Sequence, residues 1–350
     1  MRALPGSERT VNRSPTLEEI AQLAGVSRST VSRVINNHPY VREEIRERVL
    51  QVVRENDYQP HLAARSLATR RTRVVGVIIP QSVVTVFTDP FFSFLLCGVT
   101  QTCNAHRYHL MLSLFNDPAG PQEMYRRLIR GGHLDGVIVA SARVDDPLIV
   151  RLLKDSVPFV LVGRHPEERI SYVDVDNVAA AQTAVEHLIR LGHRRVATIT
   201  GPLSTTSGED RLEGYRRALE AHRLPVDETL IVEGDFTEES GMSAARRLLP
   251  LSPSAIFAAS DIMAVGALKV IREHGLRVPQ DVALVGFDDV PLAAALEPTL
   301  TTVRQPIEQL GSMAAGLLLN RLENPTDGLP PVDRVILPAK LVVRDSCGVS

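Results

Sequence analysis

The feature that most constrains the fold is an alternation of short apolar segments with amphipathic helical patterns, which begins at Val74 and continues through most of the remaining chain. The apolar segments are RVVGVII, YHLMLSL, DGVIVAS, PFVLVG, RVATIT, SAIFAAS and VALVGF. Strands that alternate with helices form parallel sheets, and nearly continuous Val, Ile and Leu indicates burial on both faces. We therefore predict two doubly wound α/β lobes with a cleft between them, where ligands bind at the strand ends.

Length and composition narrow the class of protein. A chain of 350 residues exceeds what one hydrophobic core normally serves, so two or three domains are expected. An apolar fraction of 44% with 23% charged residues is typical of a globular protein rather than a disordered or membrane-embedded one. The sequence has no apolar run of about 18 residues, and residues 1–14 lack the apolar core of a signal peptide. We therefore expect a cytoplasmic protein.

Metal and catalytic motifs are missing from the sequence. Cys97, Cys103 and Cys347 show neither CxxC pairing nor histidines at metal spacing, so we expect buried thiols without disulfides, zinc or another cofactor. There is also no Gly-rich phosphate loop, no GxSxG elbow and no HExxH motif. These absences argue against an enzyme.

The net charge of −2 is unevenly distributed. Residues 1–73 contain 13 arginines and no lysine against 8 carboxylates, a net charge of +5, so the rest of the chain carries −7. A small basic head on an acidic body suits nucleic-acid binding by the head, because phosphate contacts require cations.

Residues 16–56 carry the pattern of three short helices. Thr16 and Glu19 have capping-box spacing at the start of the first helix, and Gly25 supplies the turn into the second. In the second helix, which starts at Ser27, an apolar face of Val31, Val34 and Ile35 leaves Arg28, Ser29, Ser32 and Arg33 pointing outward. The third helix, about Arg42 to Asn56, buries Ile45, Val49, Val52 and Val53. This arrangement is typical of a helix-turn-helix DNA-binding motif, although unrelated helix pairs share it.

Long segments of the sequence resemble those of the lac-repressor (LacI/GalR) family of transcriptional regulators. In the head, the resemblance lies in TLEEIAQLAGVSRSTVSRVINN and VREEIRERVLQVVRENDYQPHLAARSLAT. In the body, it continues in VDVDN, HLIRLGHRRVATITGP, DRLEGYRRALEA, SDIMAVGALKVIREHGLRVPQDVALVGFDD, PTLTTVRQP and LVVRDS. It covers roughly residues 16–346 and implies a repressor whose affinity for operator DNA is controlled by a small molecule.

The resemblance also implies a division of the chain. A flexible extension (1–14) precedes the helix-turn-helix domain (15–59), and a hinge helix with its linker (60–73) leads to a periplasmic-binding-protein-like effector and dimerisation domain (74–346). The effector domain is expected to cross between its lobes near residues 175 and 303. The sequence shows no leucine-heptad tail of the kind that tetramers of this family use, so we expect a homodimer on a pseudo-palindromic operator.

The DNA contacts follow from family positions. Arg28, Ser29 and Arg33 match positions that face base edges, where an arginine pairs bidentately with guanine. The positions expected to hold the phosphate backbone are Ser27, Thr30, Ser32 and Asn36. A solvated or phosphate-bound Arg33 remains open.

The hinge matches a minor-groove element. Leu67 matches the leucine that is inserted between the central base pairs, and Ala64 is small enough for two hinges to approach each other. The alternative for Leu67 is packing of the hinge against the body.

The family's effector contacts map to six positions in the body, namely Asp89, Arg211, Phe236, Ser260, Asp261 and Asp288. An arginine donor and aspartate acceptors suit hydroxyls, and an aromatic face stacks on the C–H surface of a sugar, so the implied effector is a mono- or oligosaccharide. Structural roles stay open for three of them: turn capping for Asp288, an ion pair for Arg211 and core packing for Phe236. The competing interpretation of the whole chain is a sugar-binding receptor without DNA binding.

Three departures from the family pattern affect these assignments. Arg42 stands where a cap serine is usual in the third helix, and Ser260 stands where many members have asparagine. Between Pro80 and Pro90 the stretch QSVVTVFTD is longer than in common members, and we expect a long loop over 81–89 at the rim of the cleft.

Overall fold

A computed structural model describes residues 15–35, 38–58, 71–80, 82–114, 123, 125–140, 143–325 and 331–348. The chain divides into two compact units, Met1–Thr72 and Arg73–Ser350, which we call the head and the body. Four predicted features lie outside the described residues: the extension 1–14, Asn36, Ala64 and Leu67.

The described part of the head contains three helices, α1 (Leu17–Leu23), α2 (Arg28–Ile35) and α3 (Glu43–Glu55). The predicted capping box is confirmed, because the Thr16 hydroxyl accepts from the Glu19 N–H and the Glu19 carboxylate accepts from the Thr16 N–H. Gly25 has a φ of +63°, which confirms the predicted turn. The helices enclose a small core of Ile20, Ala21, Ala24, Val31, Val34, Val49 and Tyr58.

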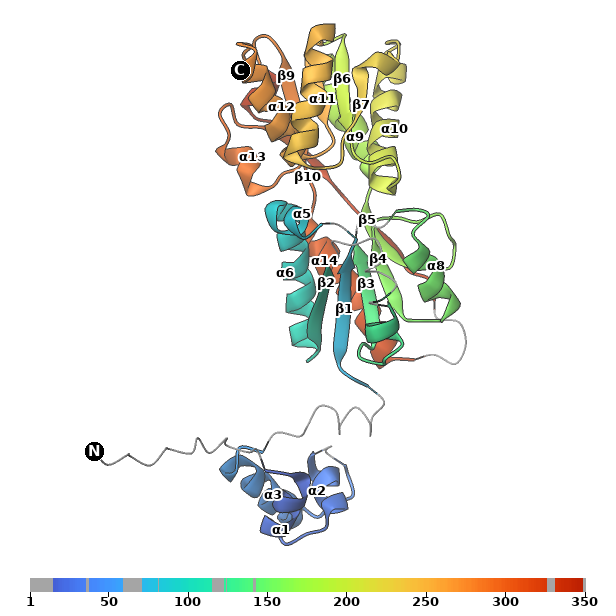
Figure 1. Cartoon of the computed structure of the whole chain (residues 1–350), viewed down its shortest axis with the longest axis vertical. Coiled ribbons are helices and arrows are strands. Elements are labelled where there is room, and N and C mark those ends of the chain that lie inside the picture. The colour runs from blue at the N-terminus through green and yellow to red at the C-terminus, as the bar shows by residue number, and fades with distance from the viewer. Residues whose placement is uncertain are drawn as a thin grey trace, which may run out of the picture. The chain divides into compact units, whose positions relative to one another are not determined.

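The described part of the body contains two lobes, each built on a six-stranded sheet (Figure 1). In lobe 1 the strand order is β11-β5-β4-β3-β1-β2, with β1 (Val74–Ile79), β2 (His109–Leu114), β3 (Gly136–Ala140), β4 (Phe159–Val162), β5 (Tyr172–Val175) and β11 (Arg334–Leu337). In lobe 2 it is β12-β10-β9-β8-β6-β7, with β6 (Val196–Thr200), β7 (Ile231–Glu233), β8 (Ala255–Ala258), β9 (Ala283–Asp288), β10 (Thr301–Arg304) and β12 (Lys340–Val342). Every apolar segment singled out in the sequence is a strand.

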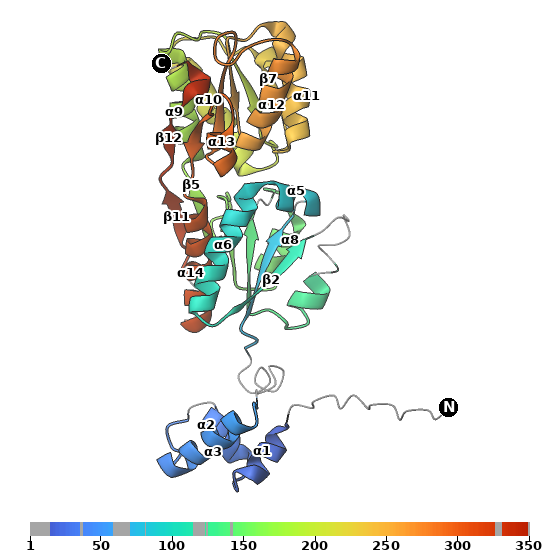
Figure 2. The ribbon, with the colours of Figure 1, turned by 90° about the vertical axis from the view of Figure 1, so that its left-hand side faces the viewer.

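Helices cover both faces of the sheet in lobe 1. They are α5 (Val83–Thr88), α6 (Pro90–Ala105), the π-helical turn η1 (Tyr125–Ile129), α8 (Pro147–Lys154) and α14 (Ile307–Glu323). Val75, Val77 and Ile79 of β1 face α6 and α14, which lie side by side in Figure 2, whereas Ile78 faces α8 and η1. This alternation explains why the strand sequences are apolar throughout.

Lobe 2 is layered in the same way. Helices α9 (Asn177–Arg190) and α10 (Thr206–Ala221) pack on one face of its sheet, and α11 (Glu238–Leu248) and α12 (Asp261–Glu273) pack on the other. The short helix α13 (Pro291–Ala295) follows β9, and single 3-10 turns are η2 (Glu228–Leu230), η3 (Leu249–Leu251) and η4 (Asp345–Cys347). Side-chain oxygens of Thr205 and Ser260 cap the N-termini of α10 and α12.

The described chain passes between the lobes three times: between β5 and α9, between β10 and α14, and between β11 and β12. Two of these passages, near residues 175 and 303, were expected from the sequence, and the third was not. The third passage carries no helical pattern, because the chain runs directly from strand to strand. Arriving without a crossover helix, β12 pairs antiparallel with β10, and this is the one antiparallel pair among the described strands.

The expectation of a loop over 81–89 was wrong, since residues 83–88 form α5. The Ser82 hydroxyl accepts from the Thr85 N–H at 3.1 Å and caps this helix, while Val86 is buried in the core of lobe 1.

The expectation of buried thiols was wrong for one cysteine. Cys103 and Cys347 are buried, but Cys97 is exposed, because α6 packs through Leu95 and Val99 and turns Cys97 outward.

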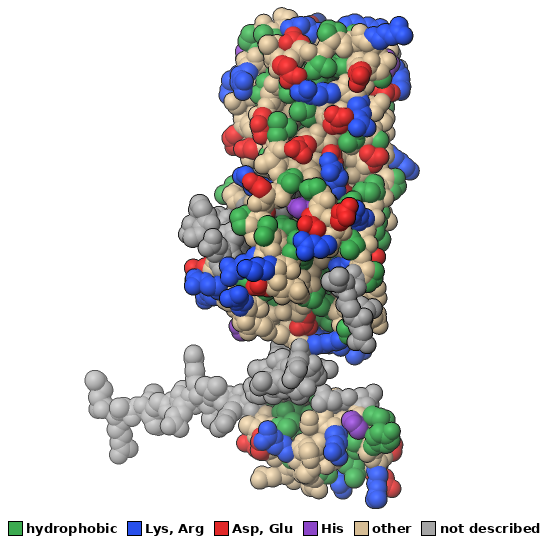
Figure 3. Space-filling view, turned by 90° about the vertical axis from the view of Figure 1, so that its right-hand side faces the viewer, with side chains coloured by type: hydrophobic (Ala, Val, Ile, Leu, Met, Phe, Trp, Pro, Cys, Tyr) green, Lys and Arg blue, Asp and Glu red, His purple; other side chains and the backbone are tan. Residues whose placement is uncertain are grey.

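Basic and acidic side chains are interspersed over the face of the molecule drawn in Figure 3. Within the described ranges, no helix is long and apolar enough to cross a membrane. The same residues include no group of three or more His, Cys, Asp or Glu side chains placed to hold a metal ion.

Helices α6 and α14 approach each other at two glycines. A Cβ atom at Gly98 would lie 1.9 Å from the carbonyl oxygen of Glu308, and one at Gly311 would lie 2.2 Å from that of Leu95. The contacts are with backbone atoms, so they cannot be relieved by a side-chain rotation.

We predict that Gly98→Ala lowers the free energy of unfolding by about 2 kcal/mol, because the added methyl group forces the two helices apart. Gly316→Ala in α14 is the matched control, since its Cβ would meet nothing within 4 Å. The control should be neutral or stabilising by up to about 1 kcal/mol. Urea unfolding followed by circular dichroism measures both, and equal effects of the two substitutions would contradict the close approach.

Candidate functional site

The cleft between the lobes contains a cavity lined by residues of both. Five of the six expected effector residues line it, namely Asp89 from lobe 1 and Arg211, Phe236, Ser260 and Asp288 from lobe 2. Asp288 ends β9, Asp89 and Ser260 cap helices, Phe236 follows β7, and Arg211 lies in the second turn of α10. Most of them therefore lie near the ends of strands, where ligands bind in parallel sheets.

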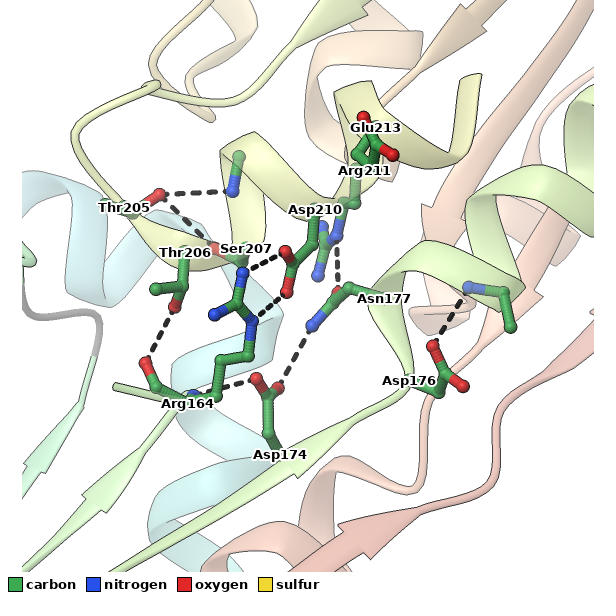
Figure 4. Close-up of polar contacts among 12 residues, drawn as sticks. Arg164, Asp174, Asp176, Asn177, Thr205, Thr206, Ser207, Asp210, Arg211 and Glu213 are labelled. Atoms are coloured by element: carbon green, nitrogen blue, oxygen red, sulfur yellow. Dashed lines mark hydrogen bonds and ion pairs between the residues drawn. The ribbon is translucent and has the colours of Figure 1, made fainter. Parts of the chain in front are cut away.

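Arg211 is the central cation of the cavity, and it is 5% exposed. Its Nε donates to Asn177 Oδ1 at 2.9 Å (Figure 4). Its Nη1 donates to the Ala259 carbonyl at 2.5 Å. The guanidinium carbon lies 3.8 Å from the centroid of the Phe287 ring, and Nη1 lies 3.7 Å from Asp288 Oδ1. Contacts with other groups of the protein, including the ion pair with Asp288, therefore hold the Arg211 side chain in place. The same side chain also lines the cavity.

Asp288 ends β9 on the cavity side, with a φ of +118° that non-glycine residues rarely adopt. Gln305 Nε2 donates to its Oδ1 at 2.5 Å. Burial raises the pKa of Asp288 to about 7, partly opposed by the charge of Arg211. Near pH 7 the Asp288 carboxyl is therefore present in both its charged and its protonated form, and Gln305 donates to one of its oxygens.

Phe236 contributes an aromatic face to the cavity. Its backbone has a φ of +68°, and its ring passes over Gly201, where a Cβ atom would lie 2.1 Å from the ring carbon Cζ. The ring centroid is 5.8 Å from the guanidinium carbon of Arg211. Gly201 therefore makes room for this aromatic surface.

Ser260 and Asp261 are adjacent in the chain, but only Ser260 lines the cavity. The Ser260 hydroxyl accepts from the Met263 N–H at 3.2 Å and lines the cavity. Asp261 is fully buried and does not line it, because its carboxylate accepts from the Val290 N–H at 3.0 Å and from the Thr302 hydroxyl at 2.5 Å. The structure thus places Asp261 behind the site, where it braces the segment after β9.

Asp89 faces the cavity from lobe 1, where it caps α6 by accepting from the Phe91 N–H at 2.9 Å. It is 6% exposed, and burial raises the pKa of its carboxyl to about 6. Two buried carboxyls, Asp89 and Asp288, therefore line the same cavity from opposite lobes.

Several polar residues in or near the cavity were not predicted from the sequence, and four of them belong to the hydrogen-bond network around Arg211 and Asp288: Arg164, Asp174, Asn177 and Gln305. Asp174 and Asn177 belong to the block VDVDN, and Arg164 follows the strand segment PFVLVG. The strand-end rule applied to these segments would have found three of the four.

In the head, α2 presents the predicted outward face. Arg28, Ser29 and Arg33 are exposed, while Val31 and Val34 are buried beneath them. The Ser27 hydroxyl accepts from the Thr30 N–H at 3.2 Å in the geometry of a helix cap, and it lies 2.8 Å from the Ser29 hydroxyl. Arg28 forms an exposed ion pair of 2.7 Å with Glu18 of α1. Thr30 and Ser32 are partly buried, and α3 begins after Arg42 without a side-chain cap, at the departure noted in the sequence.

A helix-turn-helix unit in one chain with a two-lobed body and a polar cleft defines the class of ligand-controlled DNA-binding regulators. Residues 16–61 match the family model of bacterial regulatory proteins of the lacI family, and residues 185–347 match a periplasmic binding protein-like domain.

Characterised relatives extend over nearly the whole chain. It is 43% identical over 339 residues to the HTH-type transcriptional regulator CelR of Thermobifida fusca, covering 95% of this chain and 98% of the relative. It is 38% identical over 317 residues to the ribose operon repressor of Escherichia coli (strain K12), with coverages of 89% and 94%.

Solved structures of two transcriptional regulators are also similar to this chain over nearly its whole length. A complex of the transcriptional regulator CelR with cellobiose has a TM-score of 0.75 at 40% identity and covers 95% of this chain and 99% of that one. A lac repressor dimer bound to operator and the anti-inducer ONPF has a TM-score of 0.82 at 27% identity, with coverages of 96% and 99%. The chain belongs to the LacI family and is a transcriptional regulator rather than an enzyme.

The buried Asp89 carboxyl gives a pH-dependent prediction. Its pKa rises from 3.8 to about 6 in the folded protein, so the folded state keeps the proton to higher pH than the unfolded chain. The stability that this proton supports is therefore lost as the pH rises from about 4 to about 6. Asp89→Asn keeps an oxygen that can cap α6 and removes the charge.

We predict that the free energy of unfolding of Asp89→Asn is higher than that of the wild type by roughly 3 kcal/mol at pH 8, because a charged carboxylate is no longer buried. The two proteins should be equally stable near pH 4. Urea unfolding across this range measures the difference, and a difference that does not change with pH would contradict the prediction.

Proposed function

We propose that the protein is a cytoplasmic repressor that binds a pseudo-palindromic operator as a homodimer and changes its operator affinity when a sugar binds between the lobes of the body. The observation that carries the proposal is the cavity, because residues of both lobes line it. A ligand there contacts both lobes, so its binding energy depends on how they are arranged. Such differential affinity is what a ligand needs to shift an equilibrium between two states.

The side chains of the cavity favour a polyhydroxylated effector. Hydroxyls accept from the guanidinium of Arg211 and donate to Asp89 and Asp288, and the ring of Phe236 offers a face for C–H groups. Ser260 adds a small polar group, whereas Asp261 supports the site from behind. The structure of CelR with cellobiose and the name of the ribose operon repressor identify a disaccharide and a monosaccharide as the sugars to test.

Asp288→Asn tests the effector site. The substitution keeps an oxygen for Gln305 but weakens hydrogen bonds from sugar hydroxyls, and we expect the Kd of the sugar to rise more than tenfold, since bonds to charged groups contribute about 1.5–3 kcal/mol. Calorimetric titration with cellobiose and with ribose measures the effect. Operator affinity without sugar should stay close to the wild-type value.

Glu228→Gln is the control for this experiment, because Glu228 forms an exposed pair with Arg216 away from the cavity lining. It should leave sugar affinity unchanged. If the wild type bound no mono- or disaccharide in a broader panel, the assignment of a sugar effector would be wrong.

The head is proposed to read the operator through the exposed face of α2. Arg28, Ser29 and Arg33 would contact base edges, and the phosphate contacts would come from Ser27, Thr30, Ser32 and Asn36. Ala64 and Leu67 are proposed to form the minor-groove contact of the hinge. The lac repressor dimer bound to operator supports this arrangement and the dimeric state.

Replacing Arg28 should change the preferred sequence. Loss of one bidentate arginine contact removes roughly 1–3 kcal/mol of discrimination at one position of each half-site, so Arg28→Ala should relax the consensus there. Ser32→Ala should instead weaken binding to all sequences alike, because a phosphate contact carries no sequence information. Selection from a randomised duplex library measures both, and an unchanged consensus for Arg28→Ala would refute base readout by this residue.

A further inference from the structure

An ion pair joins the two lobes beside the effector cavity (Figure 4). Arg164 follows β4 in lobe 1, and Asp210 lies in the first turns of α10 in lobe 2. Arg164 Nε donates to Asp210 Oδ2 at 2.5 Å, and Arg164 Nη2 donates to the other carboxylate oxygen. The pair is therefore bidentate, the geometry in which an arginine binds a carboxylate most strongly. The Asp210 side chain is 8% exposed and that of Arg164 is 39% exposed.

Two further hydrogen bonds join lobe 1 to the N-terminal end of α10 or to the residues just before it. The Thr206 hydroxyl donates to the Arg164 carbonyl at 2.9 Å, and the Val144 N–H donates to the Ser204 carbonyl at 3.1 Å. Both connect loops of lobe 1 to the N-terminal end of α10 or the residues just before it. Of these three contacts, only the Arg164–Asp210 pair is ionic.

The ion pair closes a ring of polar contacts that includes the effector residue Arg211. The Arg164 N–H donates to Asp174 Oδ2 at 2.8 Å, and Asn177 Nδ2 donates to Asp174 Oδ1 at 3.0 Å. Arg211 Nε then donates to Asn177 Oδ1 at 2.9 Å, and Arg211 directly follows Asp210 in α10. Figure 4 shows these side chains converging around the start of α10.

The ring spans the first passage of the chain between the lobes, because Asp174 lies in β5 and Asn177 begins α9. Two side-chain contacts of the ring cross between the lobes: Asn177 with Asp174, which lie three residues apart in the chain, and Arg164 with Asp210. Because the chain itself keeps Asp174 near Asn177, separation of the lobes opens the Arg164–Asp210 pair and leaves Arg211 on its partners in lobe 2. The ion pair is thus the contact in the ring that can open without dismantling the site.

We propose that Arg164 and Asp210 form a latch that favours the closed arrangement of the lobes and thereby holds Asp89 of lobe 1 across the cavity from Arg211 of lobe 2. The latch rests on the proposed effector site for its functional meaning, but its effect on lobe closure needs no ligand. A ligand that binds the closed arrangement has an apparent affinity proportional to the fraction of closed molecules. Weakening the latch therefore weakens effector binding through positioning.

The direct test measures lobe separation without ligand. Spin labels are attached to the full-length chain through Lys154→Cys in lobe 1 and Glu220→Cys in lobe 2, both exposed sites, in a Cys97→Ser background. Asp210→Asn keeps the shape of the side chain and removes its charge. The control is Glu213→Gln, which disrupts an exposed pair with Arg217 on the same helix.

The latch predicts a longer and broader distance distribution for Asp210→Asn, and a wild-type distribution for Glu213→Gln. An unchanged distribution for Asp210→Asn overturns the latch whatever the effector is. If Glu213→Gln changes the distance distribution as much as Asp210→Asn does, the latch is also overturned. The change in distance would then follow from removing any negative charge from α10.

The second test measures cellobiose binding by calorimetry. Asp210→Asn should raise the Kd about tenfold and Glu213→Gln should not change it. Arg164→Asp and Asp210→Arg should each weaken binding, and combining them should restore most of the affinity, because the pair is re-formed with reversed charges. Additive losses in the double variant overturn the latch. If wild-type protein does not bind cellobiose, the proposed effector fails, and the distance measurement still decides the latch.

Discussion

Burial of the Arg211 guanidinium is the constraint on which the cleft depends. A cation at 5% exposure is tolerated only when partners replace the lost water, and here its three polar partners come from three different parts of lobe 2. Asn177 begins α9, the Ala259 carbonyl follows β8, and Asp288 ends β9. The ring of Phe287 provides a fourth contact from within β9. The relative positions of these elements are therefore tied to one side chain that also lines the cavity.

Strained backbone gathers at the same place. Phe236, Asp288 and Asp289 all have positive φ, a conformation that costs about 1–3 kcal/mol for residues other than glycine. Asp289 is held by Arg304 Nε at 2.5 Å and Arg344 Nη2 at 2.6 Å, so its conformation is enforced by two charged donors. The strained backbone lets the aromatic ring of Phe236, the carboxylate of Asp288 and its neighbour Asp289 point in directions that regular strand or helix geometry does not allow.

Features that depend on residues close together in the sequence could be predicted, whereas contacts between residues far apart in the sequence could not. Burial on both faces produces continuous apolar strands, and the Thr16–Glu19 capping box spans only three residues, so both are visible in the sequence. The pairing of Arg164 with Asp210 joins positions 46 residues apart and leaves no periodic trace. Ser260 and Asp261 are adjacent at the start of α12, yet only Ser260 lines the cavity, and no local pattern separates the two.

The interleaving of the lobes has a consequence for synthesis on the ribosome. Lobe 2 takes α9 to α13 and five of its six strands from one continuous stretch and lacks only the edge strand β12 and η4, whereas lobe 1 needs both α14 and β11, which follow that stretch. Until Ile307–Glu323 has emerged, the apolar side of α6 that packs against α14 has no cover. Lobe 2 can thus bury most of its core before α14 has been made, whereas lobe 1, whose synthesis begins earlier, stays partly open until α14 has emerged.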